Sequence, residues 1–174
     1  MLTISGVLDH ELILRNTPNL ENLKVTLQKS ENKGCGLFAT KPIRKGEIIA
    51  YYKLKIYNER QYKSPTNWIY SCSVYTKKGD PITCLIGDLY EDSVPPPLND
   101  IPFWGHFANE PNLNERSNSE LNTNSKHNYR NRQNFKIGDI LLYELVATHY
   151  IEPKHEVLWY YGEEYPRKYR VSKL

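Results

Sequence analysis

The sequence has little or none of several features that mark common protein classes. It contains three cysteines among 174 residues, Cys35, Cys72 and Cys84, and this odd, widely spaced set fits neither a disulfide framework nor paired zinc ligands. No apolar run approaches the ~18 residues of a membrane span, and the first residues lack the basic-then-apolar order of a signal peptide. We therefore expect a soluble protein of a reducing intracellular compartment, nucleus or cytoplasm, with no membrane partner.

An excess of charge of one sign is also missing. The chain has 23 Lys and Arg against 20 Asp and Glu, a formal net charge of +3. Binding of nucleic acid usually needs a dense Lys/Arg stripe, so we expect no direct nucleic-acid partner. The sequence lacks a nucleophile elbow, a phosphate-binding loop and a zinc-protease helix. His149 and His155 have no partner at ligand spacing, and no metal site is predicted.

Tyrosine, by contrast, is abundant, with 14 residues, and the length fits one domain over residues 1–174. Alternating, β-branched and aromatic segments predict strands at residues 23–27, 47–57, 82–89 and 140–147. Residues 68–75 fit a strand or a short aromatic helix. Residues 92–102, with three consecutive prolines, predict an extended surface loop, and the Asn-rich residues 109–134 predict a long polar excursion. The pattern favours a mainly β fold of several small sheets with few short helices.

Three clusters of residues are candidates for chemistry. The first is Gly34-Cys35-Gly36, whose two glycines allow the backbone to approach a ligand closely. The commoner role of such a pair is a hairpin turn, here between the strands near residues 25 and 48. Residues 104–111 place one histidine and one amide beside a loop, and alone they fit a packed edge entering a turn. Residues 147–162 contain a tight turn around Pro153, followed by an aromatic run that ends at Gly162.

Taken in order, these clusters resemble the SET-domain lysine methyltransferases, in a compact form similar to viral SET proteins. Residues 34–39 (GCGLFA) and 43–49 (IRKGEII) resemble the family opening G-x-G-L-x-A and I-x-K-G-E-x-I. Residues 147–153 (ATHYIEP) and Tyr161-Gly162 resemble the ending A-x-R-x-I-x-P followed by Y-G. The similarity covers about residues 22–166, with an inserted region at about 60–102. No cysteine triad follows Gly162, so the zinc-binding tail of many family members is absent.

The middle motif departs from the family pattern R-F-x-N-H-S-x-x-P-N. Residues 106–111 read HFANEP and keep the Phe and the first Asn. His106 stands for the Arg, and Glu110 for the His whose backbone meets the cofactor adenine. The second Asn is either Asn112 or Asn118. This departure leaves open a second class of function, a SET-fold module that binds protein without catalysis. A β-rich structural protein would require the order of the motifs to be chance.

The resemblance implies methyl transfer from S-adenosylmethionine to a lysine of a protein or peptide, with a histone tail among the candidates. Tyr161 stands at the place of the catalytic tyrosine. The implied cofactor-binding residues are Gly34, Cys35, Gly36, Leu37, His106, Phe107, Asn109 and Glu110. The implied walls of the substrate-lysine channel are Trp68, Tyr70, Trp159 and Tyr165. The implied fold is the SET-type β-clip with a threaded C-terminal segment, and the oligomeric state stays open.

Overall fold

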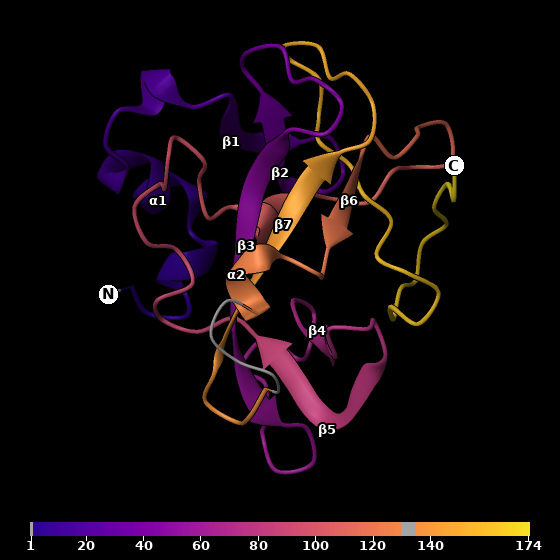
Figure 1. Cartoon of the computed structure of the whole chain (residues 1–174). Coiled ribbons are helices and arrows are strands. Elements are labelled where there is room, and N and C mark those ends of the chain that lie inside the picture. Colours follow the sequence, from indigo (N-terminus) through magenta and orange to yellow (C-terminus); the bar gives the residue numbers. More distant parts are fainter. Residues whose placement is uncertain (1, 130–134) are drawn as a thin grey trace.

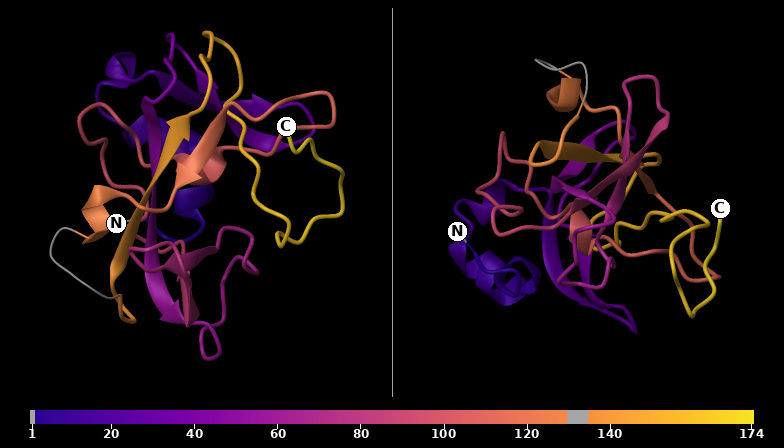
Figure 2. Two further views of the ribbon diagram at one scale, coloured as in Figure 1. Left: turned by 45° about the vertical axis from the view of Figure 1, so that its right-hand side comes forward. Right: turned by 90° about the horizontal axis from the view of Figure 1, so that it is seen from below.

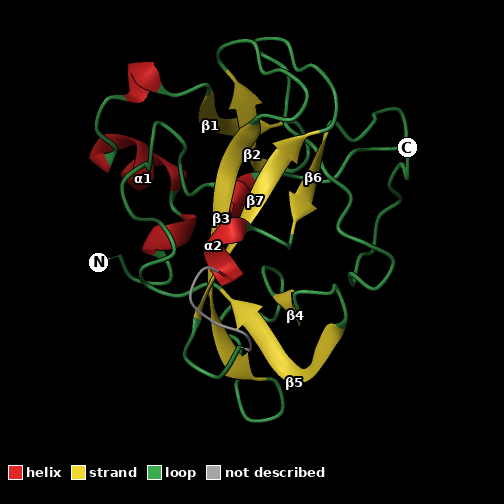
Figure 3. Cartoon of the chain, viewed as in Figure 1, coloured by secondary structure: helices red, strands yellow, loops and turns green. Residues whose placement is uncertain are grey.

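The protein is described here by a computed structural model that covers residues 2–129 and 135–174. Its strands are β1 (Val25–Ser30), β2 (Gly34–Ala39), β3 (Ile48–Asn58), β4 (Cys72–Tyr75), β5 (Pro81–Asp88), β6 (Ser119–Asn122) and β7 (Ile140–Ala147). Its helices are α1 (His10–Asn16), α2 (Lys126–Tyr129) and the 3₁₀ turns η1 (Gly6–Leu8), η2 (Leu20–Asn22) and η3 (Gly105–Phe107). Strands and loops make up most of the chain (Figure 3), which confirms the predicted mainly β class. No helix within the described ranges is long and apolar enough to cross a bilayer.

A five-stranded antiparallel sheet forms the centre of the molecule. Its strand order is β4-β5-β3-β7-β6, and the long strand β3 runs beside β7 through the middle of the fold (Figure 1). Along β7, alternate residues from Leu141 to Ala147 are buried, as expected for a strand with one face on the core. The predicted strand at residues 140–147 is confirmed with the same bounds.

The glycines at positions 34 and 36 lie in a strand and not in a turn. Strand β2 pairs with β1 from Ser30 opposite Gly34 to Val25 opposite Ala39, and residues 31–33 form the connecting turn. Gly34 has φ of 75°, a left-handed conformation that glycine adopts without steric cost. The prediction of a hairpin turn between the strands near residues 25 and 48 is therefore wrong, because this segment is itself the return strand of a separate two-stranded sheet.

Only the second half of residues 68–75 forms a strand. Asn67 and Trp68 have φ of 52° and 66°, and this left-handed backbone interrupts both strands and helices. The Trp68 amide donates to Ser64 Oγ at 3.0 Å, and that hydroxyl donates to the buried carboxylate of Asp88 at 2.6 Å. Burial raises the pKa of Asp88, and the hydrogen bond from Ser64 opposes this shift only in part. A side-chain network thus holds a turn where local propensity predicts regular structure.

The Asn-rich segment is more regular than its composition predicts. It contains β6 and α2, and residues 130–134 of the predicted excursion lie outside the described residues. The Asn128 side chain donates to Leu142 O at 3.1 Å and accepts from Leu142 N at 2.7 Å. One amide side chain therefore satisfies the backbone of β7 beyond the end of β6, as a neighbouring strand would. The polar composition of this segment supplies hydrogen bonds to the sheet.

Two hydrophobic clusters fill the interior. The first lies between the small sheet, the start of β3 and η3, and includes Leu37 and Trp104. The second packs around β3, β5 and β7 and includes Leu54. The N-terminal segment contributes to both, with Ile13 in the first cluster and Val7 in the second. The N-terminal helices and the C-terminal segment lie on opposite sides of the central strands (Figure 2).

One buried histidine ties the N-terminal segment to the centre. His106 Nε2 lies 2.7 Å from Val7 O, and since a carbonyl only accepts, this nitrogen carries the proton and donates. The imidazole packs against Phe107, with ring centroids 4.3 Å apart. Burial lowers the pKa of His106 from 6.5 to about 4, and the bond to Val7 opposes the shift only in part. The side chain is therefore neutral at pH 7.

We predict that His106 makes the protein less stable as the pH falls from about 6.5 to about 4. In this range the unfolded chain binds a proton on the imidazole that the folded chain does not, and the complete titration removes roughly 3 kcal/mol of stability. Urea unfolding at pH 7.5 and pH 5 should show a smaller stability loss for His106→Gln than for the wild type. An identical pH dependence in the two proteins would contradict this origin of the acid sensitivity.

Candidate functional site

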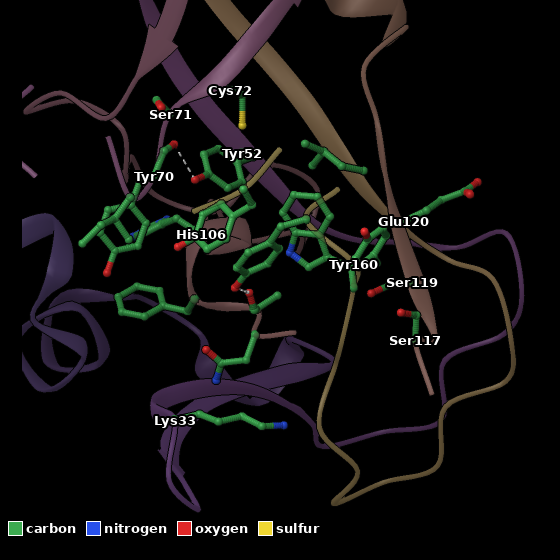
Figure 4. Close-up of a pocket in the computed structure, with 18 of the residues that line it drawn as sticks. Lys33, Tyr52, Tyr70, Ser71, Cys72, His106, Ser117, Ser119, Glu120 and Tyr160 are labelled. Carbon is green, nitrogen blue, oxygen red and sulfur yellow. Dashed lines mark hydrogen bonds between the residues drawn. The ribbon is translucent and has the colours of Figure 1, made fainter. Parts of the chain in front are cut away.

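A large cavity opens between η3, the β4 end of the sheet and the C-terminal segment. Its volume is about 1070 Å³, slightly above the roughly 300–1,000 Å³ of small-molecule sites. Tyr52, Tyr70 and His106 lie along one side of the cavity, and Ser119 and Glu120 lie on the opposite side (Figure 4). The cavity therefore collects residues from distant parts of the sequence.

Tyr161 is fixed within this cavity at both ends of the residue. Its hydroxyl donates to Ala108 O at 2.6 Å, and its backbone amide donates to Glu110 Oε1 at 2.9 Å. Burial raises the pKa of Tyr161 well above 10, and the nearby Tyr165, Tyr169 and Glu110 add to the shift. The phenol is therefore protonated at neutral pH, and its oxygen keeps lone pairs that can accept a hydrogen bond.

Aromatic rings surround Tyr161. The ring centroids of Trp159 and Tyr165 each lie 4.7 Å from the centroid of the Tyr161 ring, at interplanar angles of 56° and 71° respectively. Tyr70 and Trp68 line the same cavity, and burial raises the pKa of Tyr70. The structure thus brings Tyr161 and the four predicted channel aromatics to one cavity.

The small sheet and the segment after η3 form another wall. Gly34, Cys35, Phe107 and Asn109 line it. The Asn109 amide donates to Cys35 O at 3.1 Å and to Glu156 Oε1 at 2.9 Å, which joins β2 to this segment. Burial raises the pKa of the Cys35 thiol to about 11, so the thiol is neutral and is no nucleophile at pH 7.

Three residues predicted to bind a cofactor lie behind the wall and not on the cavity surface. Leu37 is fully buried in the first hydrophobic cluster. A Cβ atom at Gly36 would lie 2.5 Å from Glu156 Oε1, so the absence of a side chain makes room for a residue of the protein itself. Glu110 is buried, and its carboxylate accepts the Tyr161 amide. His106, also predicted to bind the cofactor, does line the cavity, but its Nε2 donates to Val7 O.

The side chain of Asn118, and not that of Asn112, hydrogen-bonds to the C-terminal segment. Its Nδ2 donates to Glu156 O at 2.8 Å, and its Oδ1 accepts from Leu158 N at 2.9 Å. The Asn112 backbone instead bonds to Glu115. On the other side of the same segment, Asn109 and Leu158 form a parallel bridge. Residues 156–159 therefore pass between two separate asparagines, as the predicted threading requires.

Several cavity residues carry no signal in the sequence. Tyr52, Cys72, Ser117, Ser119 and Glu120 line the cavity but belong to no recognised motif. Three residues at this cavity have a buried polar side-chain atom without a hydrogen-bond partner among the described residues: Trp159 Nε1, Ser117 Oγ and Tyr160 Oη. A buried polar group without a partner is costly, so these atoms fit a polar ligand. Within residues 2–129 and 135–174, no group of three or more His, Cys, Asp or Glu residues is placed to hold a metal ion.

Two comparisons with known proteins, one with family models and one with solved structures, find matches. The family model for the SET domain matches residues 34–162. The methyltransferase domain of human PR domain-containing protein 2 is 22% identical, with a TM-score of 0.50 over 95% of this chain and 92% of that one. A candidate histone methyltransferase of Plasmodium falciparum is 17% identical, with a TM-score of 0.49 over 82% of this chain and 96% of that one. A search of curated protein sequences finds no match.

The matched segment spans most of the chain. It starts at Gly34, the first residue of β2, and ends at Gly162, directly after the tyrosine held in the cavity. The methyltransferase domain of PR domain-containing protein 2 shares the fold. By its sequence match, and with a fold that agrees, the chain belongs to the SET domain family.

Proposed function

We propose that the protein is a lysine N-methyltransferase that uses S-adenosylmethionine and acts on a protein, with a histone as one candidate substrate. The observation that carries the proposal is Tyr161, whose protonated hydroxyl is fixed on Ala108 O within an aromatic cavity. The cavity is also bordered by Cys35 and Phe107. We propose that residues 1–174 act as one domain, since Val7 and Ile13 pack into the two cores.

The wall formed by Gly34, Cys35 and Phe107 would hold the cofactor. The unpartnered Trp159 Nε1 and Ser117 Oγ are suited to polar groups of such a ligand. Bound S-adenosylmethionine supplies an electrophilic methyl group on a positively charged sulfur. Both hydrogens of the Asn109 amide are used within the protein, so Asn109 would act by holding Cys35 in place. Gly36, Leu37 and Glu110 would support the wall from behind.

The aromatic channel would favour the neutral form of the substrate lysine. A free lysine has a pKa near 10.4, and an apolar channel disfavours its charged form. A tyrosinate at position 161 would work against this by stabilising the ammonium, but burial keeps Tyr161 protonated. Its hydroxyl donates to Ala108 O and can accept an N–H from the amine. This bond would fix the direction of the nitrogen lone pair, and such alignment contributes much of a methyl-transfer rate.

Incubation with labelled S-adenosylmethionine and a panel of histones and cell extracts tests the proposal. We expect label on a lysine side chain, and a single binding site for the cofactor by isothermal titration calorimetry. No transfer together with no binding heat would contradict the proposal and favour a protein-binding module without catalysis.

We predict that Tyr161→Phe lowers kcat about 100- to 1000-fold, as loss of a single positioned hydrogen-bonding group does elsewhere. The ring is kept, so the variant should fold, with a loss of about 1 kcal/mol for the hydrogen bond to Ala108 O. Mass spectrometry of a methylated peptide gives the rate. The matched control is Tyr150→Phe, at an exposed tyrosine that should tolerate the change. Full activity of Tyr161→Phe would show that the motif alignment is wrong.

A second prediction concerns the number of methyl groups added. Trp159 packs against Tyr161 at a position where family members carry Phe or Tyr, and its indole is bulkier than either ring. Each added methyl enlarges the lysine nitrogen and needs space beside it. We expect mono- or dimethylation by the wild type, and a shift towards trimethyl-lysine in Trp159→Phe, measured by mass spectrometry at long reaction times. A wild type that readily forms trimethyl-lysine, or an unchanged product ratio in the variant, would contradict this role.

A further inference from the structure

The carboxylate of Glu110, beside the cavity, accepts four hydrogen bonds. Its side chain is 1% exposed. Oε1 accepts from Tyr161 N at 2.9 Å and from Arg167 Nη2 at 2.7 Å. Oε2 accepts from Arg167 Nε at 2.9 Å and from the Tyr169 hydroxyl at 3.0 Å. A buried carboxylate is costly unless it is paired and hydrogen-bonded, and here both oxygens are bonded twice.

Arg167 completes the network from the C-terminal side. Arg167 makes two bonds to Glu110, one from Nε and one from Nη2. Its Nη2 also donates to Gly162 O at 2.7 Å. The guanidinium carbon lies 5.4 Å from the Tyr160 ring centre and 5.3 Å from that of Tyr165, within the range of cation–π contacts. The hydrogen bonds to Glu110 raise the pKa of Arg167 further above its usual value. Arg167 therefore contacts both chain neighbours of Tyr161.

The C-terminal segment needs such contacts to stay in place. Residues 159–174 contain no helix or strand, so no regular ladder of backbone hydrogen bonds fixes them. Tyr161 is bonded to the segment 108–110 at both ends, by its hydroxyl to Ala108 and by its amide to Glu110. The position of the phenol oxygen thus depends on how firmly Glu110 holds the amide.

We infer that the ion pair of Glu110 and Arg167, here called the staple, is the positioning element for Tyr161. The staple clamps residues 160–169 to the segment after η3 and sets where the Tyr161 hydroxyl lies in the cavity. Glu110 and Arg167 are positioning residues, because they act through Tyr161 and not on the substrate. This inference rests on the proposed function for its effect on rate, but its structural part can be measured without any reaction.

Hydrogen exchange of the Tyr161 amide, followed by NMR on the full chain, measures the staple directly. In Arg167→Gln we expect exchange to accelerate at least about tenfold, because the carboxylate that accepts this amide loses its partner. Arg167→Lys keeps the charge but cannot bond both oxygens in the same plane, so an intermediate rate is expected. It also serves as the test variant if Arg167→Gln fails to fold. The matched control is Glu163→Gln, which removes the exposed Lys173–Glu163 pair in the same segment and should leave exchange unchanged.

Kinetics supply the second readout. We expect kcat of Arg167→Gln to fall about 10- to 100-fold through misplacement of Tyr161, with KM for the peptide changed much less, and kcat of Glu163→Gln to stay at the wild-type value. Unchanged Tyr161 exchange in both Arg167 variants, or unchanged kcat in them beside an active wild type, would overturn the inference. A wild type that transfers no methyl group would overturn the proposed function alone, and the exchange rates would then decide the role of the staple.

Discussion

The rest of the site depends on the hydrogen bonds that two asparagines, Asn109 and Asn118, make to one stretch of chain, residues 156–159. Asn109 and Asn118 lie on either side of residues 156–159 and bond to Glu156 and Leu158. Because this stretch has a neighbour on each side, the residues that follow it are directed into the cavity. Two residues further on, the Tyr161 hydroxyl donates to Ala108 O. The Asn109 amide also donates to Cys35 O, which joins β2 to the segment after η3.

The strands were predictable where burial follows the local pattern. Residues 140–147 form a short apolar run interrupted by Glu144, alternate residues of it are buried, and the predicted and observed bounds agree. The prediction was wrong where side chains override propensity. Ser64 and Asp88 hold the left-handed turn at Trp68, and Asn128 bonds to β7 in place of a strand. Composition alone cannot show these effects, because each joins residues that are more than ten positions apart or depends on a buried partner.

The order of the motifs was enough to locate the cavity, but not to explain how it is held. Tyr161, Trp159, Tyr165, Tyr70 and Trp68 come together as the resemblance implied. The alternatives Asn112 and Asn118 could be separated only by their hydrogen bonds. Glu110 was expected to present its backbone to a cofactor, whereas its side chain is buried against Arg167. Nothing in the sequence near Arg167 marks it, because its partner lies 57 positions away.

We propose that a methyl donor and a substrate lysine meet in this cavity. A crystal structure of the chain grown with saturating S-adenosylhomocysteine, the product form of the proposed cofactor, tests this most directly. We expect density for the ligand against Cys35, Phe107 and Trp159, with its sulfur facing the Tyr161 hydroxyl across the aromatic channel. Ligand bound elsewhere on the molecule, or a cavity without ligand at saturation, would contradict the claim.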